Sequence, residues 1–268
     1  KVHADCNWAQ VLEGSIDSAH SSSLHSTNMP TADSVASSTA TDTAWLRPSA
    51  DKSPRLDVQR LDLGFRYAAI RTPIHHPDLR DYIRVTVFQA PFTVHIPPTD
   101  QYRLSQMLVP IDDENTMFYW IAWHTDPAKG IAQADWRRFC GAEVGKDVEA
   151  VTYRKVRNAA NGYLQDRAAM RAGDFTGIYG IPTQDMAMWE SMGRIADRSE
   201  DRLGSSDKAI VTFRTMMLRA AEAAGTGEMA LADPAGLSTR AELNSFEGMV
   251  DKAADGVWAR IDRTMGQT

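Results

Sequence analysis

Apolar and polar residues alternate along several short runs in the first half of the chain, the pattern of strands that bury one face. In the run 81–89, Ile83, Val85 and Val87 share one face, and polar or aromatic side chains share the other. Short polar turns such as 112–115 separate the runs, which favours an antiparallel meander. The sequence therefore predicts a sheet-centred domain whose first strand leads into a helix. The predicted runs are 2–13 (strand into helix), 56–70, 81–89, 102–110 and 116–124.

The second half of the chain has the periodicity of helices. Residues 159–170 contain helix formers, and Ser206 is placed to cap the next helix. Thr239 and Glu242 form a capping box ahead of a last helix that reaches Ile261. The apolar stripes are Ile210, Phe213, Met217 and Ala220 in the first of these two helices and Leu243, Phe246, Val250, Val257 and Ile261 in the last. Strands followed by helices predict an α+β fold, with a last helix long enough to lie across the sheet.

A polar segment separates the first helix from the sheet. Residues 26–55 are rich in Ser, Thr, Ala, Asp and Pro, a loop composition with too few apolar groups to pack a core. Because this segment follows two histidines directly, it is a candidate lid or subunit contact. A plain surface loop explains the same composition.

Composition and charge exclude several functions. The 268 residues carry a net charge of −6, which gives no electrostatic reason to expect nucleic acid. No window offers the eighteen or so apolar residues of a membrane span, and no signal peptide is visible at the start. Two cysteines, Cys6 and Cys140, are too few for a disulfide framework and are expected to be small buried groups. The sequence predicts a cytoplasmic protein without nucleic-acid or membrane partners.

Two histidines near the start suggest metal chemistry. His20 and His25 lie five residues apart, with Asp17 three residues before the first. Two imidazoles and one carboxylate on one side of a metal form the facial triad of non-haem Fe(II) oxygenases. Five residues exceed the spacing of one helical face, so a helix must distort or end between the two histidines. Ordinary surface or loop histidines remain the alternative reading of the spacing.

The segment from Asn7 to His25 resembles the start of the catalytic domain of Rieske-type non-haem iron aromatic-ring-hydroxylating oxygenases, in the phthalate 4,5-dioxygenase group. Three later segments resemble the same family. They are Phe92-Thr-Val-His-Ile-Pro-Pro98, Val109-Pro-Ile-Asp-Asp-Glu-Asn-Thr116 and Gly177-Ile-Tyr-Gly-Ile-Pro-Thr-Gln-Asp-Met-Ala-Met-Trp-Glu-Ser-Met-Gly193. Together these segments cover most of residues 2–210.

The resemblance implies a helix-grip (START-like) catalytic domain, in which an antiparallel sheet wraps a long C-terminal helix and encloses a substrate cavity. Residues 1–268 would be the mononuclear-iron domain, with 26–55 as a polar loop or lid and 203–268 as C-terminal helices. A Rieske domain holds its [2Fe–2S] cluster with two Cys and two His in short-spaced pairs, which this sequence lacks. We therefore expect the cluster domain before Lys1 or on another polypeptide.

The resemblance also implies roles for single residues. His20, His25 and Asp185 would bind Fe(II), although Asp185 alone would read as an ordinary carboxylate in a helix first turn. Asp17 would bridge an iron-ligand histidine to a cluster-ligand histidine of the neighbouring subunit, whereas a helix cap is its plain reading. Glu13 would lie next to the metal ligands without binding the metal itself. Glu190 is expected to have a structural role.

An aromatic carboxylate substrate would need cations in the cavity, and the guanidinium fork suits this task. Arg84 is the best candidate because its strand is otherwise apolar; Arg47 is a second, and Ser18 would join them. Surface exposure is the alternative for any single arginine.

The function implied is the oxygenase component of a ring-hydroxylating dioxygenase that acts on a phthalate-like aromatic carboxylate with Fe(II) and O2. Electrons would come from NADH through a flavin- or ferredoxin-type reductase and the Rieske cluster, within a homotrimer or hexamer. A monooxygenase or O-demethylase of the same family is a second reading. A third is a non-catalytic helix-grip protein that only binds ligands in its cavity.

Overall fold

A computed structural model describes residues 1–31, 47–97, 102–228, 244–252 and 258 of the chain. Its centre is an eight-stranded antiparallel sheet in the order β1-β7-β6-β5-β4-β3-β2, with β8 paired to β4. The strands are β1 Val2–Ala4, β2 Arg55–Leu61, β3 Gly64–Arg71, β4 Arg80–Gln89, β5 Thr93–Ile96, β6 Arg103–Pro110, β7 Thr116–Trp123 and β8 Phe246–Asp251. The predicted meander and α+β class are confirmed. The run 56–70 is two strands, because a two-residue turn at 62–63 separates β2 from β3.

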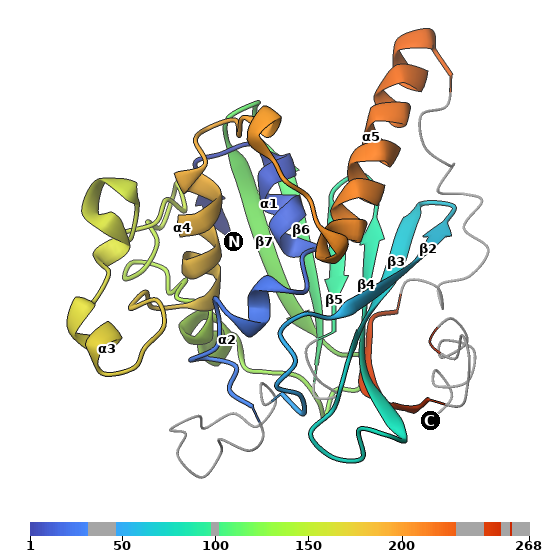
Figure 1. Ribbon diagram of the computed structural model, residues 1–268. Helices are drawn as coiled ribbons and strands as arrows, with labels where there is room; N and C mark the ends of the chain where they lie inside the picture. The colour runs from blue at the N-terminus through green and yellow to red at the C-terminus, as the bar shows by residue number, and fades with distance from the viewer. Residues whose placement is uncertain (32–46, 98–101, 229–243, 253–257, 259–268) are drawn as a thin grey trace.

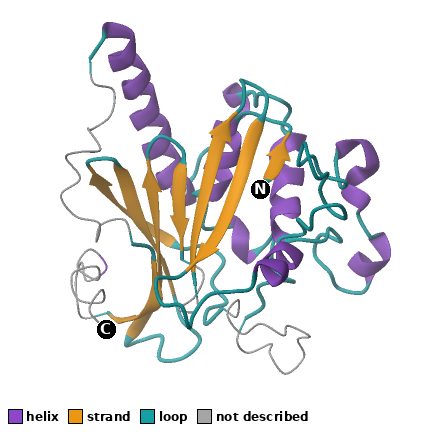
Figure 2. Cartoon of the chain, turned by 180° about the vertical axis from the view of Figure 1, so that it is seen from behind, coloured by secondary structure: helices purple, strands orange, loops and turns teal. Residues whose placement is uncertain are grey.

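Helices α1, α4 and α5 lie on one face of the sheet, and the view from behind shows the strands in front of them (Figures 1 and 2). Leu12 of α1 and Phe213 of α5 belong to the core on this face, and Phe213 packs edge-on against Phe88 of β4. The helices and helical turns are α1 Trp8–Ser15, η1 His20–Ser22, α2 Gln133–Phe139, η4 Ala159–Leu164, α3 Arg167–Arg171, α4 Ile181–Ser191, η5 Arg198–Glu200, η6 Ser205–Asp207 and α5 Lys208–Thr226.

Close packing holds α1 against α4. The Gln10 side chain donates to the carbonyl oxygens of Trp189 (3.1 Å) and Gly193 (3.0 Å) and accepts from the amide of Ala196. A Cβ atom at Gly14 would lie 2.0 Å from Trp189 Nε1, so only glycine permits this approach. The segment after α1 and the helix α4 are thereby fixed relative to each other.

We expect Gly14→Ala to destabilise the protein by about 1–3 kcal/mol, because the added methyl group overpacks against the buried Trp189 ring. Gly225→Ala in α5 is the matched control, since a Cβ atom there meets open space and alanine favours a helix. Urea unfolding of both variants measures the effect, which should have opposite signs. Equal stabilisation in both would show that α1 and α4 can separate freely.

Glu190 at the end of α4 is the centre of a buried polar network. Its Oε1 atom lies 2.6 Å from Lys155 Nζ and accepts from the amide of Asp5 at 2.9 Å, and its Oε2 atom accepts from the Tyr163 hydroxyl at 2.8 Å. Lys155 and Glu190 each expose 4% of the side chain. The network ties α4 to the chain start and to the 155–163 region, which agrees with the structural role expected of Glu190.

Two helical predictions in the middle of the chain are corrected. The predicted helix 159–170 is two short pieces, η4 and α3, because Gly162 is left-handed (φ 59°) and Asp166 caps a new helix at the amides of Ala168 and Ala169. The helix α5 begins with Asp207 rather than Ser206 at its cap. Its predicted stripe is confirmed by the burial of Ile210, Phe213 and Ala220.

The prediction of helices through 203–268 is wrong for 246–251, which form strand β8. The short strand β5 pairs only with 87–89 of β4, so the same edge of β4 offers 80–85 to β8. Unpaired backbone groups of a buried strand need partners, and β8 supplies them. Phe246 and Val250 then pack on a second apolar cluster with Ile83 and Trp258 on the far side of the sheet.

Parts of other predictions lie outside the described residues. These are 32–46 of the polar segment, where the lid was predicted, and the capping box Thr239–Glu242 at the predicted start of the last helix. Among the described helices, none combines the length and the apolar character that a bilayer crossing requires. Cys6 and Cys140 are buried and unpaired, as predicted.

Candidate metal centre

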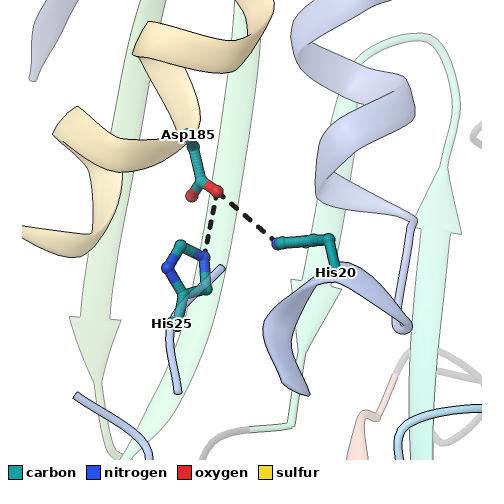
Figure 3. Close-up of side chains that lie close together, drawn as sticks. All are labelled: His20, His25 and Asp185. Carbon is teal, nitrogen blue, oxygen red and sulfur yellow. Dashed lines mark ion pairs between the residues drawn. The ribbon is translucent and has the colours of Figure 1, made fainter. Parts of the chain in front are cut away.

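His20, His25 and Asp185 converge from two parts of the chain (Figure 3). His20 begins the turn η1, His25 follows it, and Asp185 projects from α4. The Oδ1 atom of Asp185 lies 3.0 Å from His25 Nε2 and 3.5 Å from His20 Nε2. The three ligand atoms all lie within 4.8 Å of one another. The predicted trio is therefore brought together, and the helical turn η1 ends at Ser22, between the two histidines, as the five-residue spacing predicts.

The hydrogen bonds of Gln184 determine which ring nitrogen of His25 carries a proton and which one faces Asp185. Gln184 donates its Nε2 hydrogens to Asn28 Oδ1 (3.0 Å) and to the Ile178 carbonyl (2.9 Å). Its Oε1 atom must then accept from His25 Nδ1, 2.7 Å away. A neutral imidazole protonated at Nδ1 presents a bare Nε2 atom. That lone pair would face the Asp185 carboxylate across 3.0 Å, an arrangement that a bound metal ion or a second proton on the ring would stabilise.

His20 is oriented in the same way by Asp17. Asp17 Oδ2 lies 3.2 Å from His20 Nδ1, and the Asp17 carboxylate also accepts from the amides of Ala19 and His20. Burial alone would lower the pKa of His20, but the Asp17 hydrogen bond and the nearby Asp185 charge outweigh it and raise this pKa. Burial would raise the pKa of Asp17, yet the bonds from His20 and the backbone lower it. Asp17 thus stays ionised behind His20.

The donor set fits a divalent transition metal. Two adjacent ligands at about 2.1 Å from one ion lie about 3 Å apart, close to the 3.0 Å between His25 Nε2 and Asp185 Oδ1. Two imidazoles and one carboxylate match the non-haem Fe(II) triad, and each imidazole has an acceptor on its far nitrogen, which fixes its orientation.

A pocket of about 590 Å³, open solvent at its mouth included, lies beside the trio. Its polar lining residues include Ser18, Arg47 and Arg84, and its apolar lining residues include Leu104 and Trp120. Arg84 is only 5% exposed, so it faces the pocket rather than bulk water. The structure therefore places all three predicted substrate residues around one cavity that His20, His25 and Asp185 also line.

Arg71 holds the segment that joins Asp17 to His20. Its Nη2 atom donates to the Ser18 carbonyl at 2.7 Å, and burial lowers the pKa of its guanidinium. Glu13, in contrast, faces away from the trio: its carboxylate pairs with Arg198 (2.5 Å) and Arg214 (2.9 Å). In the described part of the chain Glu13 makes no hydrogen bond or ion pair with His20, His25 or Asp185, and its ion pairs join α1 to η5 and α5.

The sequence did not reveal that Gln184 accepts a hydrogen bond from His25, although Gln184 stands beside Asp185 in the segment that resembles the family. We expect Gln184→Leu to weaken metal binding about 10- to 100-fold, because the imidazole of His25 loses the acceptor that fixes its tautomer. Gln106→Leu is the control, since Gln106 is a buried amide that lines the same pocket and makes no hydrogen bond to a histidine among the described residues. Titration with Co(II) against a chelator measures both. Equal affinity in the two variants would contradict the orienting role.

The fold and this centre define the class of the chain. Residues 1–266 match the family described as "LigXa C-terminal domain like", and the chain belongs to that family.

Particular relatives agree with the resemblance seen in the sequence. The chain is 49% identical over 272 residues to the phthalate 4,5-dioxygenase oxygenase subunit of Pseudomonas putida, which covers 98% of the chain and 60% of the relative. It is 34% identical over 238 residues to the 3-chlorobenzoate-3,4-dioxygenase oxygenase subunit of Comamonas testosteroni, covering 82% and 52%. A 5,5'-dehydrodivanillate O-demethylase oxygenase subunit of a Sphingobium species is 25% identical over 237 residues, covering 83% and 43%. The chain thus spans roughly half the length of these relatives.

Proposed function

We propose that the chain is the catalytic domain of the oxygenase component of a Rieske-type aromatic-ring-hydroxylating dioxygenase. The observation that carries this proposal is the convergence of His20, His25 and Asp185 on one point beside the pocket. These residues would hold Fe(II), which supplies the binding and activation of O2 when bound. Membership in the family and the names of the relatives support the same reading.

The substrate is an aromatic carboxylate. Arg47 and Arg84 provide guanidinium donors for the carboxylate, and the apolar walls accept the ring and exclude water. Arg47 has no carboxylate within 4.0 Å in the described part of the chain; its Nη2 atom lies 2.9 Å from Met29 Sδ. At Arg47 a ligand anion would therefore meet a guanidinium that has no ion-paired carboxylate among the described residues. Anchored by its carboxylate, the ring would lie in the same pocket as His20, His25 and Asp185.

We expect Arg47→Met to weaken the binding of benzoate about 10- to 100-fold, the cost of a lost charge-assisted hydrogen bond. The binding of neutral benzamide should change far less, because it needs no cation. Arg103→Met is the control, since Arg103 pairs with Asn244 and does not line the pocket. Calorimetric titration of both ligands makes the comparison. An unchanged benzoate affinity would remove Arg47 from the carboxylate site.

Electrons reach the centre from outside this domain. In the proposed assembly, NADH reduces a reductase, which reduces a [2Fe–2S] Rieske cluster, and Asp17 provides the hydrogen-bonded route to His20. The contact between Asp17 and His20 Nδ1 supports this role, since it leaves the other imidazole nitrogen for iron. A homotrimer or hexamer would bring the cluster of one subunit to the iron of its neighbour.

A monooxygenase or O-demethylase is the second candidate, and the Sphingobium relative carries such a name. The experiment that tests the primary proposal is the iron content after anaerobic Fe(II) loading, with about one iron per chain expected. Product analysis with labelled O2, in the presence of a Rieske domain and reductase, then separates two incorporated oxygen atoms from one. A chain that binds no iron but binds benzoate would be a non-catalytic cavity protein.

A further inference from the structure

Arg84 has a resident counter-ion that comes from the far end of the chain. In the β4–β8 register, Arg84 stands directly opposite Glu247. Its Nε atom lies 3.4 Å from Glu247 Oε2, and its Nη2 atom donates to the carbonyl of Pro97. The Nη1 edge makes no hydrogen bond within the described residues. Glu247 and Pro97 thus hold the Nε and Nη2 atoms of Arg84, and the Nη1 atom is left to bind a ligand in the pocket that Arg84 lines.

Glu247 is itself held in place. Its side chain is 16% exposed, and its Oε1 atom accepts from the hydroxyl of the buried Tyr82. Burial has the largest effect on the pKa of the Tyr82 phenol and raises it, and the charge of Glu247 raises it further. Glu247 does not line the pocket, so it touches Arg84 without touching a ligand there.

The pair sets the charge that a ligand meets. In a low-dielectric site, a carboxylate beside a guanidinium cancels much of its field, and a second carboxylate must compete with the first. Without the charge of Glu247, Arg84 would be a buried cation with no ion-paired carboxylate among the described residues. A ligand carboxylate at the Nη1 edge would then supply the missing charge and bind more tightly, while a neutral ligand would gain little.

We propose that Glu247 is a specificity-determining residue that limits how strongly the pocket prefers anionic over neutral aromatic ligands. It acts through Arg84 and is a positioning residue rather than a catalytic one. The inference rests on the proposed function in one respect, that this pocket is the substrate site.

The test measures the ratio of the benzamide Kd to the benzoate Kd by calorimetric titration of the metal-loaded chain. Glu247→Gln keeps the side-chain shape and removes the charge, and it is expected to raise this ratio about tenfold. Asp251→Asn is the matched control. It removes a carboxylate from the same strand, opposite Arg80 in the same register, but its side chain is 74% exposed. Its ratio should equal that of the wild type.

A second variant keeps the inference open to refutation if Glu247→Gln does not fold. Glu247→Asp retains the charge, so the ratio is expected to stay within about threefold of the wild-type ratio. A tenfold change in this variant would show that packing rather than charge sets the ratio, and it would overturn the proposal. An unchanged ratio in Glu247→Gln, with normal benzoate binding by the wild type, would also overturn it and leave the proposed function standing. A wild type that binds neither ligand would remove the substrate site itself.

Discussion

An Asp185→Ala chain is expected to bind Fe(II) at least about 100-fold more weakly than the wild type, beyond the loss expected for residues that only support a ligand. The substitution removes the anionic donor of the trio and leaves two neutral imidazoles, which cannot offset the charge of the ion. Anaerobic titration against a competing chelator measures the affinity, and circular dichroism confirms the fold. His20→Ala and His25→Ala should show comparable losses.

Two exposed residues provide controls for these variants. Asp135, with 59% of its side chain exposed, and His75, also exposed, lie outside the trio, so Asp135→Ala and His75→Ala should keep wild-type iron affinity. Tight iron retained in Asp185→Ala would move the third ligand elsewhere. Iron lost equally in the controls would point to non-specific binding.

A Lys155→Met chain is expected to lose about 3–5 kcal/mol of unfolding free energy, the cost of leaving one partner of a buried ion pair without its counter-charge. Lys155 and Glu190 are both nearly inaccessible, and the carboxylate cannot recover its hydration inside the protein. Urea unfolding in the presence of a chelator measures the loss without a contribution from metal binding.

The control for this prediction is an exposed pair of the same length. Lys146 Nζ lies 2.6 Å from Glu143 Oε2, the same separation as in the buried pair, but 65% of the Lys146 side chain is exposed. Lys146→Met should leave the unfolding midpoint unchanged, because exposed pairs contribute little. Equal losses in the two variants would show that burial does not govern the strength of the Lys155 contact.

The sheet could be predicted because its strands alternate. Apolar and polar residues alternate along β4 in the sequence itself. The polar turn predicted at 112–115 likewise lies between β6 and β7. β8 could not be predicted in this way. Phe246 and Val250 are four residues apart, a spacing that places them on one side of a helix and equally on one side of a strand. The free edge of β4 decides between the two, and no local pattern contains that information.

The convergence of His20, His25 and Asp185 could be predicted from spacing together with family resemblance, since each is close to a recognisable motif. The groups that orient them were harder to find. Gln184 acts on His25 across 159 residues, and Glu247 acts on Arg84 across the β4–β8 register. Such contacts depend on which elements become neighbours, whereas amphipathic patterns report only which face of an element is buried.

The pairing of β8 with β4 also bears on the order in which the protein matures during synthesis. Tyr82 and its partner Glu247 are 165 residues apart, so ribosomes have made every other described strand before the partner of Arg84 leaves the exit tunnel. Among the residues that the structure describes, Glu247 is the carboxylate that pairs with Arg84. A nascent chain stopped before β8 would already contain His20, His25 and Asp185 but not Glu247. The residues of the trio are therefore synthesised before the residue that balances the charge of Arg84.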